Sequence, residues 1–227
     1  VGFRALAKNT SHHNVAVGWA ALEENTTGNY NTSVGYRALE ENTTGTANSA
    51  FGSFSLNQNT VGIHNVAIGF NSLFNNTTGV GNIAVGGNSL GSNVSGNYNV
   101  AVGGSAGGTG NYNVAIGLNA FQVASGDQNV GVGFQVGMLT TTGSNNVALG
   151  NQALIQNTSG GNNVAVGTNS LYSATIATYN TAVGAQASYQ NLTGEYNTAL
   201  GAYALWNNTA GEKNTAVGYA ALSTATG

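Results

Sequence analysis

A five-residue phrase recurs thirteen times along this chain and constrains its fold more than any other feature. The phrase reads Asn, a branched or hydroxyl residue, a small residue, an aliphatic residue or Phe, and Gly. It begins at Asn14, and a regular 17-residue spacing then relates the copies, apart from one 14-residue and one 16-residue interval in the middle of the chain. This period is too short for a pair of helices, because helical repeats need roughly 33 residues or more. The repeat therefore predicts a solenoid of short extended segments.

The Asn and the Gly of the phrase are present in all thirteen copies, and we expect them to form one corner of each coil. Gly accepts a positive φ at a corner, and repeated Asn side chains can stack as amide ladders between coils. Representative positions of this structural repeat are Asn14, Gly18, Asn31, Gly35, Asn65, Gly69, Asn163, Gly167, Asn214 and Gly218.

A second Gly lies three residues before the next Asn, and we expect it to turn the chain at the opposite corner in the same way. Ala177 takes its place once. The corner at Ala177 is therefore expected to be strained or to adopt a different turn.

Alternation within the phrase predicts a strand with two different faces. In Asn163–Gly167, Val164 and Val166 lie two residues apart and share one face, while Ala165 points the other way. The small position holds Ala, Ser or Gly in every copy. We expect the branched face to fill the core, and each coil to contain two short strands and two turns. The expected fold is all-β, a parallel β-solenoid (β-roll) of 14–17-residue coils that forms a single domain over residues 1–227.

A roll with two strands per coil has a narrow core and, on this interpretation, an exposed face of small residues. Several rolls that share an axis would bury that face and pack closely. We therefore expect a homotrimer whose axis is lined by small side chains. A lone monomer whose coils stack into one sheet is the competing possibility. The trimer face would consist of Ala16, Ala67, Ala84, Ala101, Ala115, Ala165, Ala182 and Ala216.

Composition excludes several classes of partner. Charged residues make up 5% of the chain, against about 25% in typical soluble proteins. Four basic residues and a net charge of −3 leave no electrostatic footprint for nucleic acid. No apolar run approaches the ~20 residues of a membrane span. The repeat is already under way at Val1–Gly2, and solenoids normally carry polar caps. We therefore expect either a fragment of a longer array or ends that neighbouring protein covers, and the second case would allow assembly end to end.

The phrases Asn163-Val-Ala-Val-Gly167 and Asn214-Thr-Ala-Val-Gly218 resemble the head repeats of YadA-like trimeric autotransporter adhesins. Several coils also carry an Asn-Thr-Thr-Gly turn, as at Asn25–Gly28, Asn42–Gly45 and Asn76–Gly79. The longer unit that includes this turn is similar to repeats of bacterial and phage tail-fibre-like proteins. This resemblance covers the whole chain and implies a left-handed roll, three chains together and an extracellular location, on a cell surface or in a virion fibre. The repeats of those adhesin heads have 14 residues, and most coils of this chain are longer. Only the coil Asn99–Tyr112 has 14 residues, and most of the others have three more.

Few residues suggest chemistry. His13 and His64 precede the repeat Asn in coils three apart, about 14 Å along the axis, which is too far for shared metal ligands. Glu23–Glu24 and Glu40–Glu41 stack on adjacent coils, and we expect an exposed charged patch there. We expect no catalytic residue, no metal and no cofactor, and the chain is not expected to be an enzyme.

Two further sets of residues could face a partner. Sequons occur at Asn25, Asn42, Asn76, Asn157 and Asn191, where turn chemistry is the simpler explanation. Aromatic residues follow the first Gly in several coils and could either bind glycans or pack on the neighbouring coil. They are Phe3, Trp19, Tyr36, Phe70, Phe134 and Tyr219.

These observations predict a structural and adhesive segment of an extracellular fibre that contacts a host-surface protein or glycan receptor. A self-assembling extracellular filament or scaffold without receptor binding is the alternative. An ice-binding solenoid is a further alternative, because flat solenoid faces can order water. Thr follows the repeat Asn only at Thr32, Thr181, Thr198 and Thr215, which argues against it.

Overall fold

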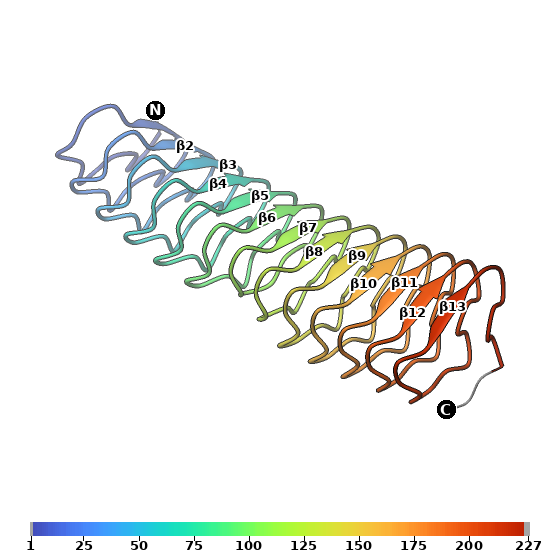
Figure 1. Ribbon diagram of the computed structural model, residues 1–227. Helices are drawn as coiled ribbons and strands as arrows, with labels where there is room; N and C mark the ends of the chain where they lie inside the picture. Colours follow the sequence, from blue (N-terminus) through green and yellow to red (C-terminus); the bar gives the residue numbers. More distant parts are fainter. Residues whose placement is uncertain (1, 225–227) are drawn as a thin grey trace. The chain divides into compact units, whose positions relative to one another are not determined.

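The structure is a computed structural model that describes residues 2–224, and in this range the chain is all-β without a helix. The chain divides into two compact units, Val1–Tyr112 and Asn113–Gly227. The boundary falls at the end of the 14-residue coil. Each unit is a β-solenoid of stacked coils (Figure 1).

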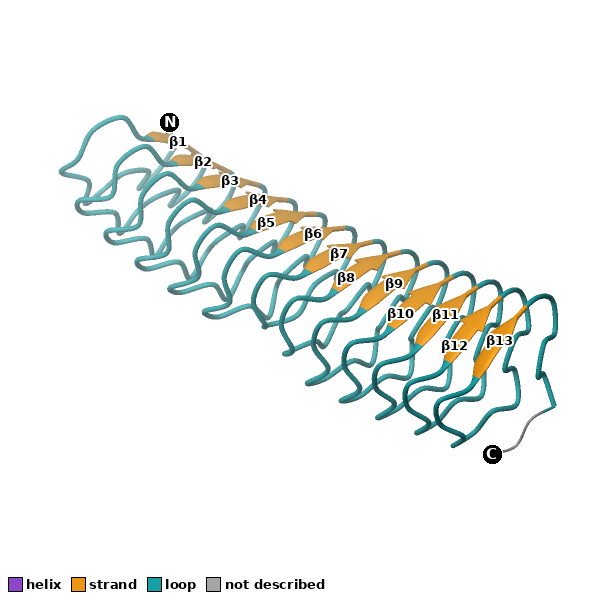
Figure 2. Ribbon diagram, in the orientation of Figure 1, coloured by secondary structure: helices purple, strands orange, loops and turns teal. Residues whose placement is uncertain are grey.

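Each repeat phrase forms one three-residue strand (Figure 2). The strands of the first unit are β1 (Val15–Val17), β2 (Thr32–Val34), β3 (Ser49–Phe51), β4 (Val66–Ile68), β5 (Ile83–Val85) and β6 (Val100–Val102). Those of the second unit are β7 (Val114–Ile116), β8 (Val130–Val132), β9 (Val147–Leu149), β10 (Val164–Val166), β11 (Thr181–Val183), β12 (Thr198–Leu200) and β13 (Thr215–Val217).

Within each unit, consecutive strands pair in parallel and equivalent residues lie side by side. Val15 pairs with Thr32 in the first unit, and Ala165 pairs with Ala182 in the second. The strand spacing in such a ladder is about 4.8 Å, so every position of the repeat forms a row along the coils. The predicted parallel β-solenoid of 14–17-residue coils is confirmed.

The expected orientation of the strands is wrong. The middle, small residue of each strand is buried, and the branched residues on either side are half-buried or exposed. The alanines expected to line a trimer axis instead face their own coil interior and are at most 5% exposed, namely Ala16, Ala67, Ala84, Ala101, Ala115, Ala165, Ala182 and Ala216.

The narrow cross-section of the coil explains this inversion. A leucine from the far side of the coil, eight residues after the repeat Asn, fills the interior opposite the strand, as Leu22, Leu39 and Leu171 do without any exposure. Small residues such as Ala21 and Ala38 precede it and are also fully buried. A large side chain in the strand would overfill this space, so only Ala, Ser or Gly can face inward.

The second half of the coil is not the expected second strand, because its backbone repeatedly enters the left-handed region. A regular coil contains three such non-glycine residues, for example Arg37 (φ 54°), Leu39 (φ 51°) and Ala47 (φ 56°). Hydrogen bonds between coils hold this conformation. Arg37 N donates to Trp19 O in one neighbouring coil (2.9 Å), and Leu39 N donates to Ser55 O in the other (3.0 Å). Inter-coil bonding therefore continues around the coil beyond the strand.

The repeat Asn residues form the expected amide ladder. The backbone N–H of Asn48 donates to Asn31 Oδ1 (3.0 Å), and Asn48 Nδ2 donates to Gly62 O (2.8 Å). Asn31 and Asn48 are both fully buried. A buried amide must be hydrogen-bonded to be tolerated, and here every coil supplies the partner for the next.

A second ladder runs along the opposite corner in the first unit. Asn42 Nδ2 donates to Asn25 Oδ1 and Asn59 Nδ2 donates to Asn42 Oδ1, both at 2.7 Å. The second Gly of the repeat belongs to this corner, but it does not supply a positive φ as expected. A Cβ on Gly28 would lie 2.2 Å from Gly45 O and 2.6 Å from Asn25 Oδ1, so close approach of backbone and amide requires the glycine.

Ala177 fits its corner because its own coil has also lost the ladder Asn, which Ala174 replaces. The turn keeps its usual bond, since Asn163 Nδ2 donates to Ala177 O (2.8 Å). The expectation of a different turn at Ala177 is therefore wrong. The missing donor has a visible consequence: the buried Asn157 Oδ1 in the preceding coil has no hydrogen-bond partner among the described residues.

We predict that restoring both residues stabilises the second unit. In Ala174→Asn/Ala177→Gly, the new amide would donate to Asn157 Oδ1 and raise the stability by about 1 kcal/mol. Ala174→Asn alone should destabilise, because its amide would collide with the Ala177 Cβ. Thermal unfolding of the three proteins tests this, and a single variant as stable as the double variant would contradict it.

The coils around Phe121 show that core volume is conserved across neighbouring coils. Phe121 stands at the position of the core leucine and is fully buried. Its ring occupies space left by two glycines of the following coil, since a Cβ on Gly131 would lie 2.5 Å, and one on Gly137 2.2 Å, from ring atoms. The strand position of Gly131 holds Ala or Ser in the other coils. The large residue and the two small ones thus compensate one another.

We therefore expect Gly131→Ala to lower stability by about 1–3 kcal/mol through overpacking. Phe121→Leu should also destabilise, by leaving a cavity. The loss of stability in the double variant should be smaller than the sum of the losses in the two single variants, because the smaller leucine side chain leaves room for the new methyl group. Denaturant unfolding of the four proteins gives the coupling, and simple additivity would show that the two positions do not share one volume.

Candidate interaction surface

The first and third residues of every strand form an outward surface that we name the strand face. Its third-residue row is apolar in all thirteen strands. That row consists of Val17, Val34, Phe51, Ile68, Val85 and Val102 in the first unit, and of Ile116, Val132, Leu149, Val166, Val183, Leu200 and Val217 in the second.

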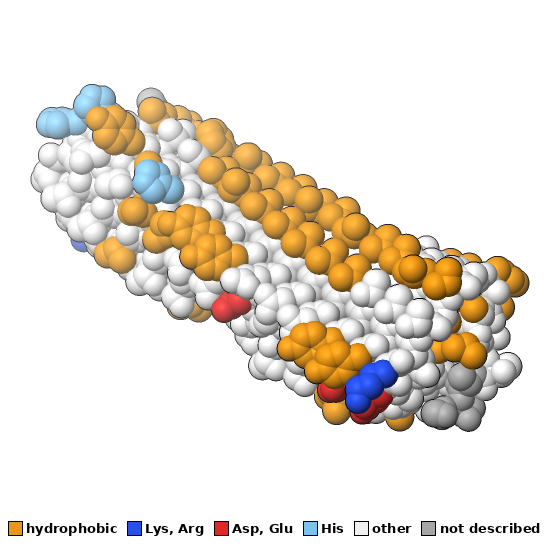
Figure 3. Space-filling model, viewed as in Figure 1, with side chains coloured by type: hydrophobic (Ala, Val, Ile, Leu, Met, Phe, Trp, Pro, Cys, Tyr) orange, Lys and Arg blue, Asp and Glu red, His pale blue; other side chains and the backbone are white. Residues whose placement is uncertain are grey.

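Much of this row is accessible to solvent. Phe51 and Ile68 are each 42% exposed, and Val132 is 41% exposed. Figure 3 shows hydrophobic side chains in rows over the strands, and no Lys, Arg, Asp or Glu occupies the strand face in either unit. Contiguous exposed apolar surface of this kind marks an interaction site.

The strand face was missed from the sequence because its residues were assigned to the core. A signal was nevertheless present. Most coils also supply an Ala-Leu or Ser-Leu pair in their second half, such as Ala21–Leu22 and Ser72–Leu73, and that pair fills much of the interior of a coil of this size.

The histidines do not form a site. His13 and His64 are exposed, and the His13 ring stacks on Tyr30 at a centroid distance of 4.9 Å. Across residues 2–224, no three His, Asp or Glu side chains come together in a group suited to a metal ion.

The expected exposed acidic patch is wrong in part, because the two acids that begin each pair are buried. Glu23 is 3% exposed and pairs with Arg4, and Glu40 is 9% exposed. Glu40 accepts hydrogen bonds from Arg37 Nε (2.6 Å) and Asn57 Nδ2 (3.0 Å). Glu24 stays at the surface and pairs with Lys8. Glu23, Glu24 and Glu40 thus form ion pairs within the fold rather than an open cation site, and Glu41 remains exposed.

Arg37 is held on several sides. The hydrogen bond to Glu40 raises the pKa of its guanidinium above the ordinary arginine value, against a smaller opposing effect of burial. Its Cζ lies 6.0 Å from the Trp19 ring centroid and 5.9 Å from that of Phe54. Arg37 therefore joins the buried carboxylate to an exposed aromatic cluster.

The sequon asparagines belong to the corner turns, and those of the first unit also take part in the second amide ladder. Asn25, Asn42, Asn76, Asn157 and Asn191 are all fully buried. Asn76 Nδ2, the atom a glycan would modify, donates to Asn59 Oδ1 (2.9 Å). In the folded protein these side chains are turn and ladder groups that are closed to glycosylation.

The aromatic residues that follow the first Gly are exposed, and several also pack on one another. Their exposed fractions run from 37% for Trp19 to 78% for Tyr219. Trp19 stacks on Tyr36 with centroids 5.1 Å apart, and Phe54 contacts Tyr36 edge-on at 5.2 Å. Such pairs stabilise the stack of coils beyond the area they bury.

Further ring rows at other positions were missed. Tyr179 and Tyr196 stack at 5.0 Å at the position before the repeat Asn. Tyr172, Tyr189 and Trp206 form a third row, nine residues after the repeat Asn, with centroids 5.0 and 5.9 Å apart. Aligning the coils on their 17-residue period would have found both rows.

Residues 2–224 include no helix with the length and apolar character required for a membrane crossing. Comparison of the chain with protein-family models, with curated proteins and with solved structures found no match. The likeness to trimeric adhesin heads and tail fibres thus rests on the repeat motif alone.

We predict that Arg37→Ala destabilises the first unit by about 1–3 kcal/mol, because the buried Glu40 carboxylate loses a charged hydrogen-bond donor. Glu40→Gln in the Arg37→Ala background should recover much of that loss, since the neutral amide needs no counter-charge. Thermal unfolding at neutral pH measures both effects. Equal stability of the single and double variants would show that the lost ring contacts of Arg37, not its charge, cause the loss.

Proposed function

We propose that this chain is a structural and adhesive segment of an extracellular trimeric fibre, on a cell surface or in a virion. The observation that carries the proposal is the apolar strand face, which recurs in every coil and lies outside the core. The proposal gives the chain no catalytic role and no cofactor.

The strand face suits other copies of the same chain. Its rows repeat at the rise of the coils, about 4.8 Å. A partner must repeat at the same interval to meet it residue by residue, and a second copy of the chain does so. Homotypic burial of Ile68, Val132 and their equivalents would remove apolar surface from water at about 25 cal/mol per Å².

The number three comes from the resemblance to adhesin heads. The surfaces that meet in such a trimer would be the branched rows of the strand face, in place of the alanines first expected. The residue that follows each strand is a glycine with a positive φ, such as Gly35 (φ 146°), so the chain bends directly after the strand.

The same construction suits a fibre that resists unfolding. Coils are hydrogen-bonded to their neighbours through strands, turns and the amide ladder of the repeat Asn residues, and a second amide ladder adds to these bonds in the first unit. No disulfide is involved because the chain has no cysteine. In repeat arrays stability comes from such nearest-neighbour interfaces. Assembly end to end into a filament or scaffold without receptor binding is the alternative that shares these features.

One observation favours ice binding as a second candidate. Thr181, Thr198 and Thr215 stand in register on β11 to β13, and they belong to the outward strand face rather than to the core. The neighbouring row is aliphatic, and Val or Ile replaces Thr in most of the remaining strands.

Light scattering of the purified chain without denaturant tests the proposal. We expect a mass three times that of the 22.7 kDa chain. The triple variant Leu149→Lys/Val166→Lys/Val183→Lys should be monomeric and remain folded, because charges on the strand face oppose its burial. The matched control Thr142→Lys/Ser159→Lys/Thr193→Lys places the same charges on exposed residues outside the strand face, and it should remain trimeric.

A monomeric wild-type chain would contradict the trimeric fibre. If that monomer also lowered the freezing point of water without changing the melting point, ice binding would replace the trimeric fibre as the proposed function. Very large assemblies would favour the filament.

A further inference from the structure

A row of stacked rings in the second unit ends abruptly and leaves an indole with an uncovered side. Tyr172, Tyr189 and Trp206 stack in successive coils, with interplanar angles of 14° and 16°. The next residue in register, one full coil after Trp206, is Ser223. Tyr189 therefore covers one face of the indole, and a small hydroxyl stands where the next ring would be.

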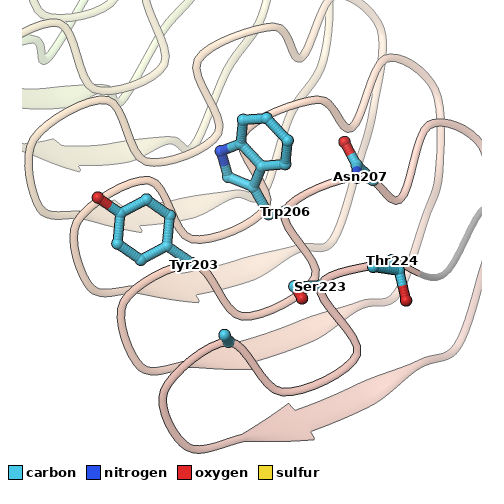
Figure 4. A pocket seen from close by; sticks show the side chains of 6 residues that line it. Tyr203, Trp206, Asn207, Ser223 and Thr224 are labelled. Carbon is cyan, nitrogen blue, oxygen red and sulfur yellow. The ribbon is translucent and has the colours of Figure 1, made fainter.

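This exchange produces a recess, which we name the Trp206 recess (Figure 4). It is lined by Tyr203, Trp206, Asn207, Ala220, Ser223 and Thr224, encloses about 390 Å³ and is open to solvent. That volume is within the range of small-molecule sites. The indole is fixed in place, since Trp206 Nε1 donates to Gln186 Oε1 (3.2 Å).

The walls of the recess combine a flat apolar surface with a neutral polar rim. The indole ring and Ala220 supply the apolar surface, and none of the described residues that line the recess is charged. The side chains of Asn207, Ser223 and Thr224 make no hydrogen bond to any described residue, so their hydrogen-bonding groups are free for a ligand. Tyr203 also lines the recess, and its hydroxyl lies at the end of its ring that points away from Ser223 and Thr224 (Figure 4).

A hexopyranose has the complementary chemistry. One face of the sugar ring presents C–H groups that pack against an indole, and its edge carries neutral hydroxyls that both donate and accept hydrogen bonds. A phosphate or carboxylate would find no cation in the lining. A purely apolar ligand would leave the amide and hydroxyl rim without partners, which costs binding energy.

We propose that the Trp206 recess binds a neutral hexopyranose unit of a glycan. This deepens the proposed adhesive function and rests on it for its biological meaning. The binding itself does not depend on the trimer, because every lining residue comes from one chain and none belongs to the strand face.

The two tryptophans of the chain allow a direct test. Trp19→Phe leaves Trp206 as the sole indole, and its fluorescence reports on the recess. We expect a saturable change, with dissociation constants in the millimolar range, on titration with at least one of three probes: soluble oligomers of glucose, of galactose and of N-acetylglucosamine. Absence of a saturable change with all three would overturn the proposal.

A filled recess provides the specific control. Ser223→Tyr in the Trp19→Phe background would continue the ring row onto the open indole face and should abolish sugar binding without unfolding the protein. Ser159→Tyr adds the same ring at an exposed site in another coil and should leave binding unchanged. Unchanged binding in Ser223→Tyr would overturn the assignment to the recess.

Light scattering on the same samples separates the two proposals. Sugar binding by a chain that is not trimeric would contradict the trimeric fibre and support the sugar site in the Trp206 recess. A trimer that binds none of the sugars would support the fibre and contradict the sugar site.

Discussion

Inter-coil hydrogen bonding at a fixed 17-residue period is the constraint on which the rest of this structure depends. Each coil places its residues beside their equivalents in the next coil, so every position of the repeat must tolerate contact with a copy of itself. Glycine meets glycine at the corner after the strand, where a Cβ on Gly35 would lie 2.4 Å from Gly52 O. Asn side chains are hydrogen-bonded to the equivalent Asn of the next coil in two buried ladders, and Tyr179 stacks on Tyr196 at the surface. The same bonds hold non-glycine residues such as Leu39 in a left-handed conformation that normally costs about 1–2 kcal/mol.

The second constraint is the small interior of a 17-residue coil. The Leu of the far side and the small residues around it fill that interior, so the strand contributes only a methyl group, a hydroxymethyl group or a hydrogen. The branched residues of the strand must then face outward, although they are the more apolar ones. A requirement of volume thus creates an apolar surface, and the proposed fibre uses that surface to bring chains together. The Phe121, Gly131 and Gly137 group shows the same requirement within the core.

The fold could be predicted from the sequence because the repeat states the period directly and because Asn and Gly at fixed places indicate corners and ladders. Which face of the strand is turned toward the core could not be predicted. Alternation of Val164, Ala165 and Val166 shows that two faces differ, and hydrophobicity alone places valine inside. The deciding quantity is the cross-section of the coil, which depends on the conformation of the second half. That conformation is held by inter-coil bonds at residues such as Arg37 and Leu39, and no local propensity indicates it. Similarly, the burial of Glu40 depends on Arg37 and Asn57 from its own coil and the next one, and the Trp206 recess depends on the single residue Ser223 that interrupts a row.

The central claim is that the small row of each strand faces the core while the branched row faces outward toward other copies. Cysteine substitution tests it directly, since the chain contains no cysteine of its own. Under mild oxidation, the Val166→Cys variant should form disulfide-linked dimers that survive in denaturing detergent. In dilute solution without denaturant, the cysteine at position 166 of any unassembled chain should react with a thiol reagent. Ala165→Cys should do neither until the protein unfolds. Cross-linking or rapid labelling at position 165, with protection at position 166 in a monomeric chain, would contradict the orientation and the account built on it.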